Sequence, residues 1–94
     1  MSLLSDAEIE QRLAVIDGWE RGEDATIVRQ WTFADFAAAI AFVDRVAALA
    51  EAANHHPDIL VHGWNKVRLT LSTHSQGGLT EADFLLAGGL NRAA

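Results

Sequence analysis

Hydrophobic positions recur along this chain with two periods, and the changes of period divide it into helices and strands. The first helical pattern follows Ser5 and Glu8, which form a capping-box pair, and Gly18 is placed to end that helix. Residues 19–21 predict a short strand. After a turn, residues 26–33 alternate between apolar and polar side chains, which predicts a longer strand.

A long second helix is predicted in the middle of the chain. Thr32 and Asp35 are placed to cap its start, it runs to about Ala53, and Pro57 stops any continuation. The helical period places one apolar stripe of this segment toward the core. That stripe consists of Phe36, Ile40, Val43 and Ala47.

The last third of the chain predicts two more strands and a third helix. Residues 59–62 and 66–72 have the pattern of strands joined by a turn, and Thr80 with Asp83 caps the helix that follows. The order α-β-β-α-β-β-α predicts the α+β class. We expect residues 1–94 to form a single small domain, in which the helices pack on one face of a four-stranded antiparallel sheet.

Size and composition limit how such a domain is stabilised. A chain of 94 residues fits one domain with a thin core, and without cysteine it has no disulfide to reinforce that core. The predicted sheet also leaves one face and two edges open. Both features favour a homo-oligomer. The absence of cysteine is typical of the reducing cytoplasm, which is the location we expect.

The charge and the hydropathy pattern argue against two classes of partner. The net charge is −6, and an acidic surface repels phosphate backbones, so we expect no nucleic-acid partner. No segment approaches the roughly 20 apolar residues of a membrane span. The N-terminal residues also lack the basic start and long apolar run of a signal peptide. We therefore expect no membrane partner.

Three of the four histidines lie near the ends of predicted elements: His55 and His56 after the long helix, and His74 after the last strand. Zinc sites usually space two ligands three to five residues apart on one element, whereas adjacent side chains diverge, so a metal site is not favoured. Histidine can both give and take a proton near neutral pH. From the residues alone, the cluster indicates either proton-transfer chemistry or ordinary capping and surface roles.

Two carboxylates are placed to support these histidines. Glu51 lies one helical turn before His55, where a carboxylate can hold an imidazole in one tautomer. Asp83 could hydrogen-bond back toward the loop that carries His74. An aspartate in the first turn of a helix is also an ordinary cap, so this second role has a plain structural alternative.

The remaining candidates carry a weaker signal. His62 is expected to lie exposed on a strand. Trp19, Trp31 and Trp64 could stack on a flat ligand, but such residues more often belong to a core or an interface. No Gly-x-Ser-x-Gly turn supports a serine nucleophile.

At these positions the chain resembles a known family, the pterin-4a-carbinolamine dehydratases, over residues 4 to 91. The resemblance rests on several motifs whose combination is far more specific than any one of them. They are Glu51-x3-His55-His56-Pro57, the run from Asn65 to His74 that reads Asn-Lys-Val-x-Leu-Thr-Leu-Ser-Thr-His, the segment Gly78-Leu79-Thr80-x2-Asp83, and the upstream Trp31-x-Phe33-x2-Phe36.

The resemblance implies a reaction, the removal of water from a 4a-hydroxytetrahydropterin to give quinonoid dihydropterin, as in tetrahydrobiopterin recycling. Hydroxide is a poor leaving group, so one group must protonate it while another takes a proton from a ring nitrogen. This general acid–base chemistry needs no metal or redox cofactor. By resemblance, His55, His56 and His74 are catalytic. We expect His56 and His74 to share proton donation and removal, and His55 to bind substrate or exchange roles with one of them.

The resemblance also implies which residues form the substrate pocket. Two departures from the vertebrate form affect its shape: Ile59 stands where that form has an aromatic residue, and residues 58–64 are one residue longer. Glu51 and Asp83 are expected as polar supporting residues. The expected substrate-binding residues are His55, His56, Pro57, Thr73, His74, Ser75 and Gln76.

The resemblance further implies a pterin substrate and a homo-oligomer, either a dimer or a tetramer. It leaves a second class of function open, that of a non-catalytic binding or regulatory partner. Members of the family are partners of a homeodomain transcription factor, relatives serve as assembly factors, and an aromatic amino acid hydroxylase is a further candidate partner. The intact histidines favour the enzyme, because a degenerate relative is expected to have lost one of them.

Overall fold

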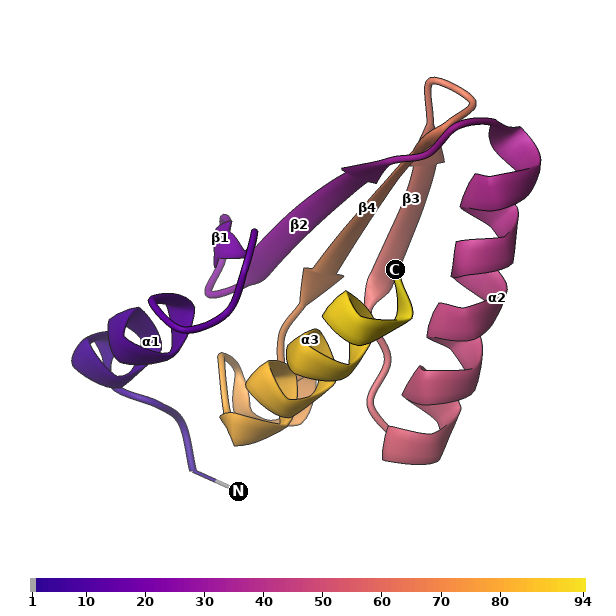
Figure 1. Cartoon of the computed structure of the whole chain (residues 1–94). Coiled ribbons are helices and arrows are strands. Elements are labelled where there is room, and N and C mark those ends of the chain that lie inside the picture. The colour runs from indigo at the N-terminus through magenta and orange to yellow at the C-terminus, as the bar shows by residue number, and fades with distance from the viewer. Residues whose placement is uncertain (1) are drawn as a thin grey trace.

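The computed structural model describes residues 2–94 and has the predicted order of elements, with one added 3-10 turn (Figure 1). None of its helices within this range is both long and apolar enough to cross a membrane. The elements are α1 (Asp6–Leu13), β1 (Glu20–Arg21), β2 (Ile27–Thr32), α2 (Phe36–Ala53), β3 (Asp58–His62), β4 (Lys66–Leu71), the 3-10 turn η1 (His74–Gln76) and α3 (Glu81–Ala93).

The four strands form one antiparallel sheet in the order β1-β2-β4-β3, which confirms the predicted α+β architecture. Figure 1 shows α2 and α3 side by side on one side of this sheet, with α1 beyond the short strand β1. Alternate residues of the strands point toward the helices and are fully buried, as a half-buried strand requires. They include Ile27, Val67, Leu69 and Leu71.

The first helix is shorter than its pattern predicts. It ends at Leu13 rather than close to Gly18, and Ala14 is its C-cap. Residues 14–18 instead turn toward the sheet, where Arg29 donates a hydrogen bond from Nη1 to the carbonyl oxygen of Asp17 at 2.6 Å. Gly18 has a φ of +79°, and a Cβ there would lie 2.5 Å from the Arg29 guanidinium. The left-handed φ favours glycine at this position, and a Cβ there would also force the Arg29 guanidinium to shift.

The predicted core stripe of α2 was wrong in phase. Phe36 is 55% exposed and Ala47 is exposed, whereas Ile40 and Val43 are only partly buried. Both stripes have helical spacing, so the period alone could not choose between them. Packing decides, because the Phe42 ring lies 4.9 Å from the Trp31 ring between centroids and joins the aromatic core. The buried stripe is Ala39, Phe42, Val46 and Ala50.

The end of α2 and the pairing of β3 with β4 place the histidines at the same end of the sheet. Asn54 takes a left-handed conformation with φ 50°, which ends α2 and lets the chain leave the helix before His55. In the antiparallel pairing of β3 with β4, Asp58 lies opposite Thr70, so the start of β3 is next to the end of β4. The segment after α2 and the segment after β4 therefore meet in space.

Candidate active site

The three histidines predicted to act together line one small cavity of about 240 Å³. His55 and His56 reach it from the segment between α2 and β3, and His74 reaches it from η1. Of the seven residues predicted to contact substrate, Pro57 and Gln76 are not among its lining residues. The cavity is lined by Asn54, His55, His56, Ser72, Thr73, His74 and Ser75.

Behind the cavity lies a fully buried carboxylate, Asp83, in the first turn of α3. Its Oδ1 lies 2.6 Å from Nε2 of His55, and its Oδ2 accepts hydrogen bonds from Thr73 Oγ1 at 2.8 Å and from the backbone N–H of Thr80 at 2.9 Å. Asp83 thus caps its helix, as predicted, and also joins that helix to both histidine-bearing segments. The contact with His55 spans 28 positions of sequence and was not predicted.

The chemistry of these groups fixes the direction of the hydrogen bonds. An ionised carboxylate only accepts, so His55 donates from Nε2 and Thr73 donates its single hydroxyl proton to Asp83. Thr80 Oγ1, which lies 2.8 Å from Thr73 Oγ1, must then be the donor in that contact. Because Nε2 of His55 carries the shared proton, Nδ1 is the acceptor nitrogen of the neutral ring.

Glu51 does not hold His55, and the expected pairing of these two residues was wrong. Its Oε2 lies 2.5 Å from Nε2 of His56, the next residue along the chain. The cause is the left-handed cap at Asn54, which takes His55 off the helical path and lets its ring turn inward to Asp83. The side chains of Glu51 and His56 are 75% and 59% exposed, so this pair lies at the surface.

His74 differs from the other two histidines, because within residues 2–94 no group hydrogen-bonds to its ring. It is exposed at the start of η1, a turn that Gly77 closes with a φ of +76°. The surrounding loop is held by the pairing of Thr73 with Gly78. In the described part of the chain, no group of three or more histidine and acidic side chains is arranged to hold a metal ion.

The other candidates lie outside this cavity. His62 is half-buried on β3, with Nε2 2.8 Å from Oε1 of Gln30. Trp19 and Trp31 belong to the core or pack against it, whereas Trp64 is 61% exposed in the turn between β3 and β4. None of the three tryptophans lines the histidine cavity.

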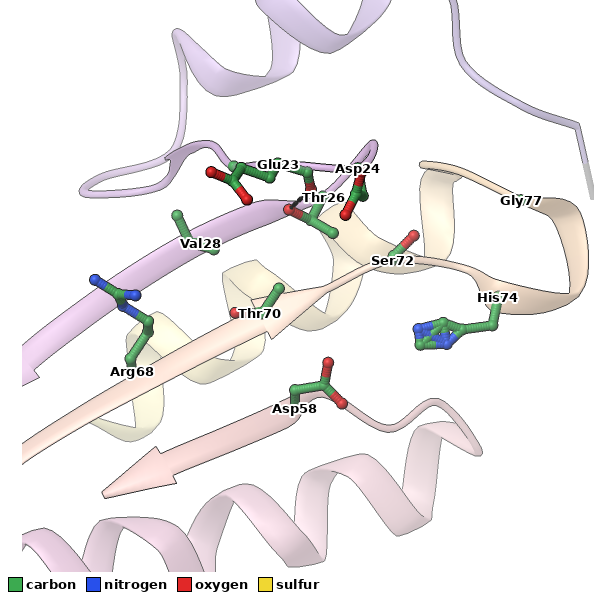
Figure 2. A pocket seen from close by; sticks show the side chains of 11 residues that line it. Glu23, Asp24, Thr26, Val28, Asp58, Arg68, Thr70, Ser72, His74 and Gly77 are labelled. Carbon is green, nitrogen blue, oxygen red and sulfur yellow. Dashed lines mark hydrogen bonds between the residues drawn. The ribbon is translucent and has the colours of Figure 1, made fainter. Parts of the chain in front are cut away.

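A larger cavity of about 750 Å³ adjoins the histidines on the face of the sheet opposite the helices. Figure 2 shows Thr70 on β4 and Ser72 just after it, with Asp58 on one side of them and His74 at the end. Glu23, Asp24 and Thr26 lie on the other side. Sequence reasoning did not single out this cavity. The only sequence feature of this cavity is the set of outward-facing polar positions on the strands. Ordinary solvated strand faces have the same pattern.

The sequence of this chain is similar to that of curated proteins. A family model for pterin 4 alpha carbinolamine dehydratase matches residues 2–93. A protein of Chloroflexus aggregans, provisionally named a pterin-4-alpha-carbinolamine dehydratase, is 52% identical over 91 residues, covering 97% of this chain and 96% of that protein. A protein of Roseiflexus castenholzii with the same provisional name is 55% identical over 86 residues, covering 92% of this chain and 90% of that protein.

Solved structures share its fold. A transcriptional coactivator/pterin dehydratase from Brucella melitensis has a TM-score of 0.93 and 35% identity, covering 99% of both chains. A pterin dehydratase-like protein, described as a RuBisCO assembly factor in the alpha-carboxysome, has a TM-score of 0.69 and 29% identity, covering 82% of this chain and 89% of that one. From the match along almost its whole length, this chain belongs to the pterin 4 alpha carbinolamine dehydratase family.

Proposed function

We propose that this protein dehydrates 4a-hydroxytetrahydropterin to quinonoid dihydropterin by general acid–base catalysis with histidine. The observation that carries the proposal is the convergence of His55, His56 and His74 on one cavity, from two segments about twenty residues apart. An arrangement of three imidazoles around one space supplies both a proton donor and a proton acceptor near neutral pH. Membership of the dehydratase family supports the same reaction.

The proposed reaction has a simple balance of atoms. The bond between C4a and its hydroxyl oxygen breaks, and an imidazolium donates a proton to the departing hydroxyl so that water leaves. A neutral imidazole takes a proton from a ring nitrogen as the new double bond to C4a forms. The enzyme donates one proton and takes one proton, so it gains none in total. The products are one water and one quinonoid dihydropterin, and no oxidant or reductant takes part.

The surroundings of the histidines support a division of roles. His74 has no ring partner in the described chain, and His56 is exposed and bonded to Glu51 only through Nε2, so each has a ring nitrogen available to exchange protons with substrate. The side chain of His55 is only 15% exposed and is anchored to buried Asp83, which suits it to bind and orient the substrate. Glu51 would then position His56, and Asp83 would position His55.

The experiment that tests this function follows the dehydration of freshly generated 4a-hydroxytetrahydropterin by ultraviolet absorbance over a range of pH. We expect the protein to accelerate the step, with at least one limb of the pH–rate profile between about pH 5 and 8, where imidazoles titrate. A rate equal to the uncatalysed one would contradict the activity. Acceleration without a limb in that range would contradict the histidine assignment.

A second candidate function is that of a non-catalytic partner protein. It is favoured by the structural neighbours, one of which is titled a transcriptional coactivator/pterin dehydratase and another a RuBisCO assembly factor. The complete set of three histidines and two supporting carboxylates favours the enzyme, since binding alone would not require it. Co-purification with an aromatic amino acid hydroxylase would support a regulatory role without excluding catalysis.

We also propose a homo-oligomer, because the outer edge of the sheet is unpaired along β3. An open edge with apolar side chains invites pairing with another chain. Ile59 and Leu60 on this strand are 40% and 50% exposed, and these surfaces would be covered in a dimer or tetramer. Sedimentation that shows only monomer at micromolar concentration would contradict this.

A further inference from the structure

The larger cavity and the histidine cavity have two lining residues in common, Ser72 and His74. The histidine cavity, at about 240 Å³, is smaller than the 300–1,000 Å³ typical of small-molecule sites, whereas the larger one lies within that range. A bicyclic ring among the histidines would therefore carry any substituent past Ser72 and His74 into the larger space. The two cavities together offer space for a ring and for a substituent on it.

The floor and one wall of the larger cavity come from neighbouring strands. Thr70 lies on the outward face of β4 and Ser72 follows directly after the end of that strand, and Asp58 lies opposite Thr70 on β3. Asp58 is also only two residues after His56, so the wall and the catalytic segment are parts of one short stretch of chain. Figure 2 shows the Asp58 carboxylate next to β4 and on the same side of the sheet as His74.

The opposite wall is the tight turn between β1 and β2. Two of its residues, Asp24 and Ala25, have φ values of 54° and 55°, a left-handed conformation that strains residues other than glycine. Ser72 holds this turn in place by donating a hydrogen bond from Oγ to the carbonyl oxygen of Ala25 at 3.1 Å. Strain of this kind persists where the surrounding structure holds it, and it is frequent beside ligand sites.

The side chains of this cavity combine hydroxyls with carboxylates. Across residues 2–94, neither Asp58 nor Asp24 forms a side-chain hydrogen bond or an ion pair, so both can accept protons from a ligand. Thr70 and Ser72 can donate or accept. Such a set suits a neutral chain of hydroxyl groups. It disfavours a phosphate beside Asp58, because the carboxylates of Glu23, Asp24 and Asp58 share its sign of charge, whereas the cation that lines the cavity, Arg68, lies at the end away from His74 (Figure 2).

We propose that this cavity selects the C6 side chain of the pterin, an inference that rests on the proposed function. The ring lies among the histidines, and the substituent extends along β4 toward Thr70. Asp58 is the main specificity-determining residue, since its carboxylate accepts from the hydroxyls of the substituent. The preferred substrates carry a neutral, hydroxylated side chain, and phosphorylated side chains bind less well. Figure 2 shows Arg68 two residues farther along β4 from Thr70, at the end of the cavity away from His74 and the ring.

The test compares substrates that differ only at C6: a methyl group, a 1,2-dihydroxypropyl group and a phosphorylated hydroxymethyl group. For the parent, we expect the highest kcat/KM with the diol and the lowest with the phosphate. Asp58→Ala should lower kcat/KM for the diol roughly tenfold, the effect of one hydrogen bond to a charged group, and leave the methyl substrate unchanged. Asp44→Ala, at an exposed position of α2 outside both cavities, is the matched control and should leave all three substrates unaltered, and Arg68→Gln reports whether this arginine recruits the phosphate.

Three results would overturn the inference: equal kcat/KM for diol and methyl substrates, an equal loss for both in Asp58→Ala, or a preference for the phosphate that Arg68→Gln abolishes.

Calorimetric binding of the stable 7,8-dihydropterins with the same C6 groups separates this inference from the proposed function. If no substrate is turned over but Asp58→Ala weakens binding of the diol alone, the catalytic proposal fails and the cavity assignment stands. If binding of the diol and of the methyl compound is equal, the cavity assignment fails.

Discussion

Two helices of this protein begin with the same pattern, a hydroxyl residue followed three positions later by a carboxylate. At α1 these residues are Ser5 and Glu8, and at α3 they are Thr80 and Asp83. Glu8 is exposed and satisfies only the start of its own helix, where its Oε1 accepts from the backbone N–H of Ser5 at 2.8 Å. Asp83 is fully buried and also holds His55 and Thr73.

The difference between the two caps lies in what surrounds them. Both carboxylates accept a hydrogen bond from the backbone N–H of the N-cap residue of their own helix, a role that the four-residue capping pattern already predicts. Only at α3 do segments from elsewhere in the chain close over the carboxylate and supply further donors. A buried acceptor with three donors specifies how those segments sit, because leaving any of the donors unpaired would cost free energy. A common helix cap thereby becomes the anchor of the candidate active site.

Among the substitutions that test the difference between the two caps, Asp83→Asn is expected to have the largest effect. The amide can accept through only one atom. Its NH2 group would face both the Thr73 hydroxyl and the Thr80 N–H at the Oδ2 position, or the His55 Nε2 at the Oδ1 position. We expect the free energy of unfolding in urea to fall by about 3 kcal/mol, and dehydration activity to fall with it. Glu8→Gln at the other cap is the matched control, and an equal loss for both variants would contradict the distinction between the caps.

A smaller effect is expected from Thr73→Val, which keeps the shape of the side chain but removes its hydroxyl. Asp83 then loses one of its three donors and Thr80 loses its acceptor. Unfolding measurements should show a loss of about 1–2 kcal/mol. Thr73→Ser retains the hydroxyl and should recover most of that loss. If serine and valine destabilise equally, the methyl packing rather than the hydrogen bond is what matters at this position.

The pair of Glu51 with His56 should contribute much less to stability than the pair of Asp83 with His55. Both side chains of the surface pair are more than half exposed, and solvent screening reduces such pairs to about 0–1 kcal/mol. We expect Glu51→Gln to change the unfolding free energy by no more than about 0.5 kcal/mol while lowering the dehydration rate. A large loss of stability with an unchanged rate would contradict the role of Glu51 as a positioning residue for His56.

The smallest effect is expected at Glu8 and depends on pH. The hydrogen bond from the Ser5 backbone, with help from the Ser5 hydroxyl and the charge of Arg12, lowers the pKa of Glu8 below its usual value of 4.5. A carboxyl with a lowered pKa stabilises the fold above its unfolded pKa, and that contribution is lost as pH falls through the folded value. Unfolding midpoints of parent and Glu8→Gln should therefore differ slightly at pH 6 and converge below about pH 3. A difference that does not shrink in acid would show that the effect of Glu8 is not electrostatic.

The two caps also show how much of this molecule the sequence could reveal. Both capping patterns, the strand alternation and the order of elements are local features, and the structure has them as predicted. The core stripe of α2 was wrong because an alanine-rich helix has two apolar stripes of the same period, and contact with Trp31 decides between them.

The arrangement of the site depends on contacts that no local pattern contains. The residues that meet at Asp83 come from three segments, and the sequence gives no distance between them. Glu51 was assigned to His55 from helical spacing, which applies only inside a helix. The helix ends at the Asn54 cap, one residue before His55, so the spacing does not apply to this pair. The outward face of β4 carried no signal of a cavity, because solvated strand faces have the same alternation.

The central claim is that the histidines of the cavity in front of the buried Asp83 catalyse the dehydration. The most direct test measures the dehydration of freshly generated 4a-hydroxytetrahydropterin by the parent, His56→Ala and His74→Ala, with His62→Ala as the control outside the cavity. We predict that the parent accelerates the step, that the first two variants lose about 100-fold or more of that rate, and that His62→Ala keeps it. A parent no faster than the uncatalysed reaction, or an equal loss in all three variants, would contradict the account.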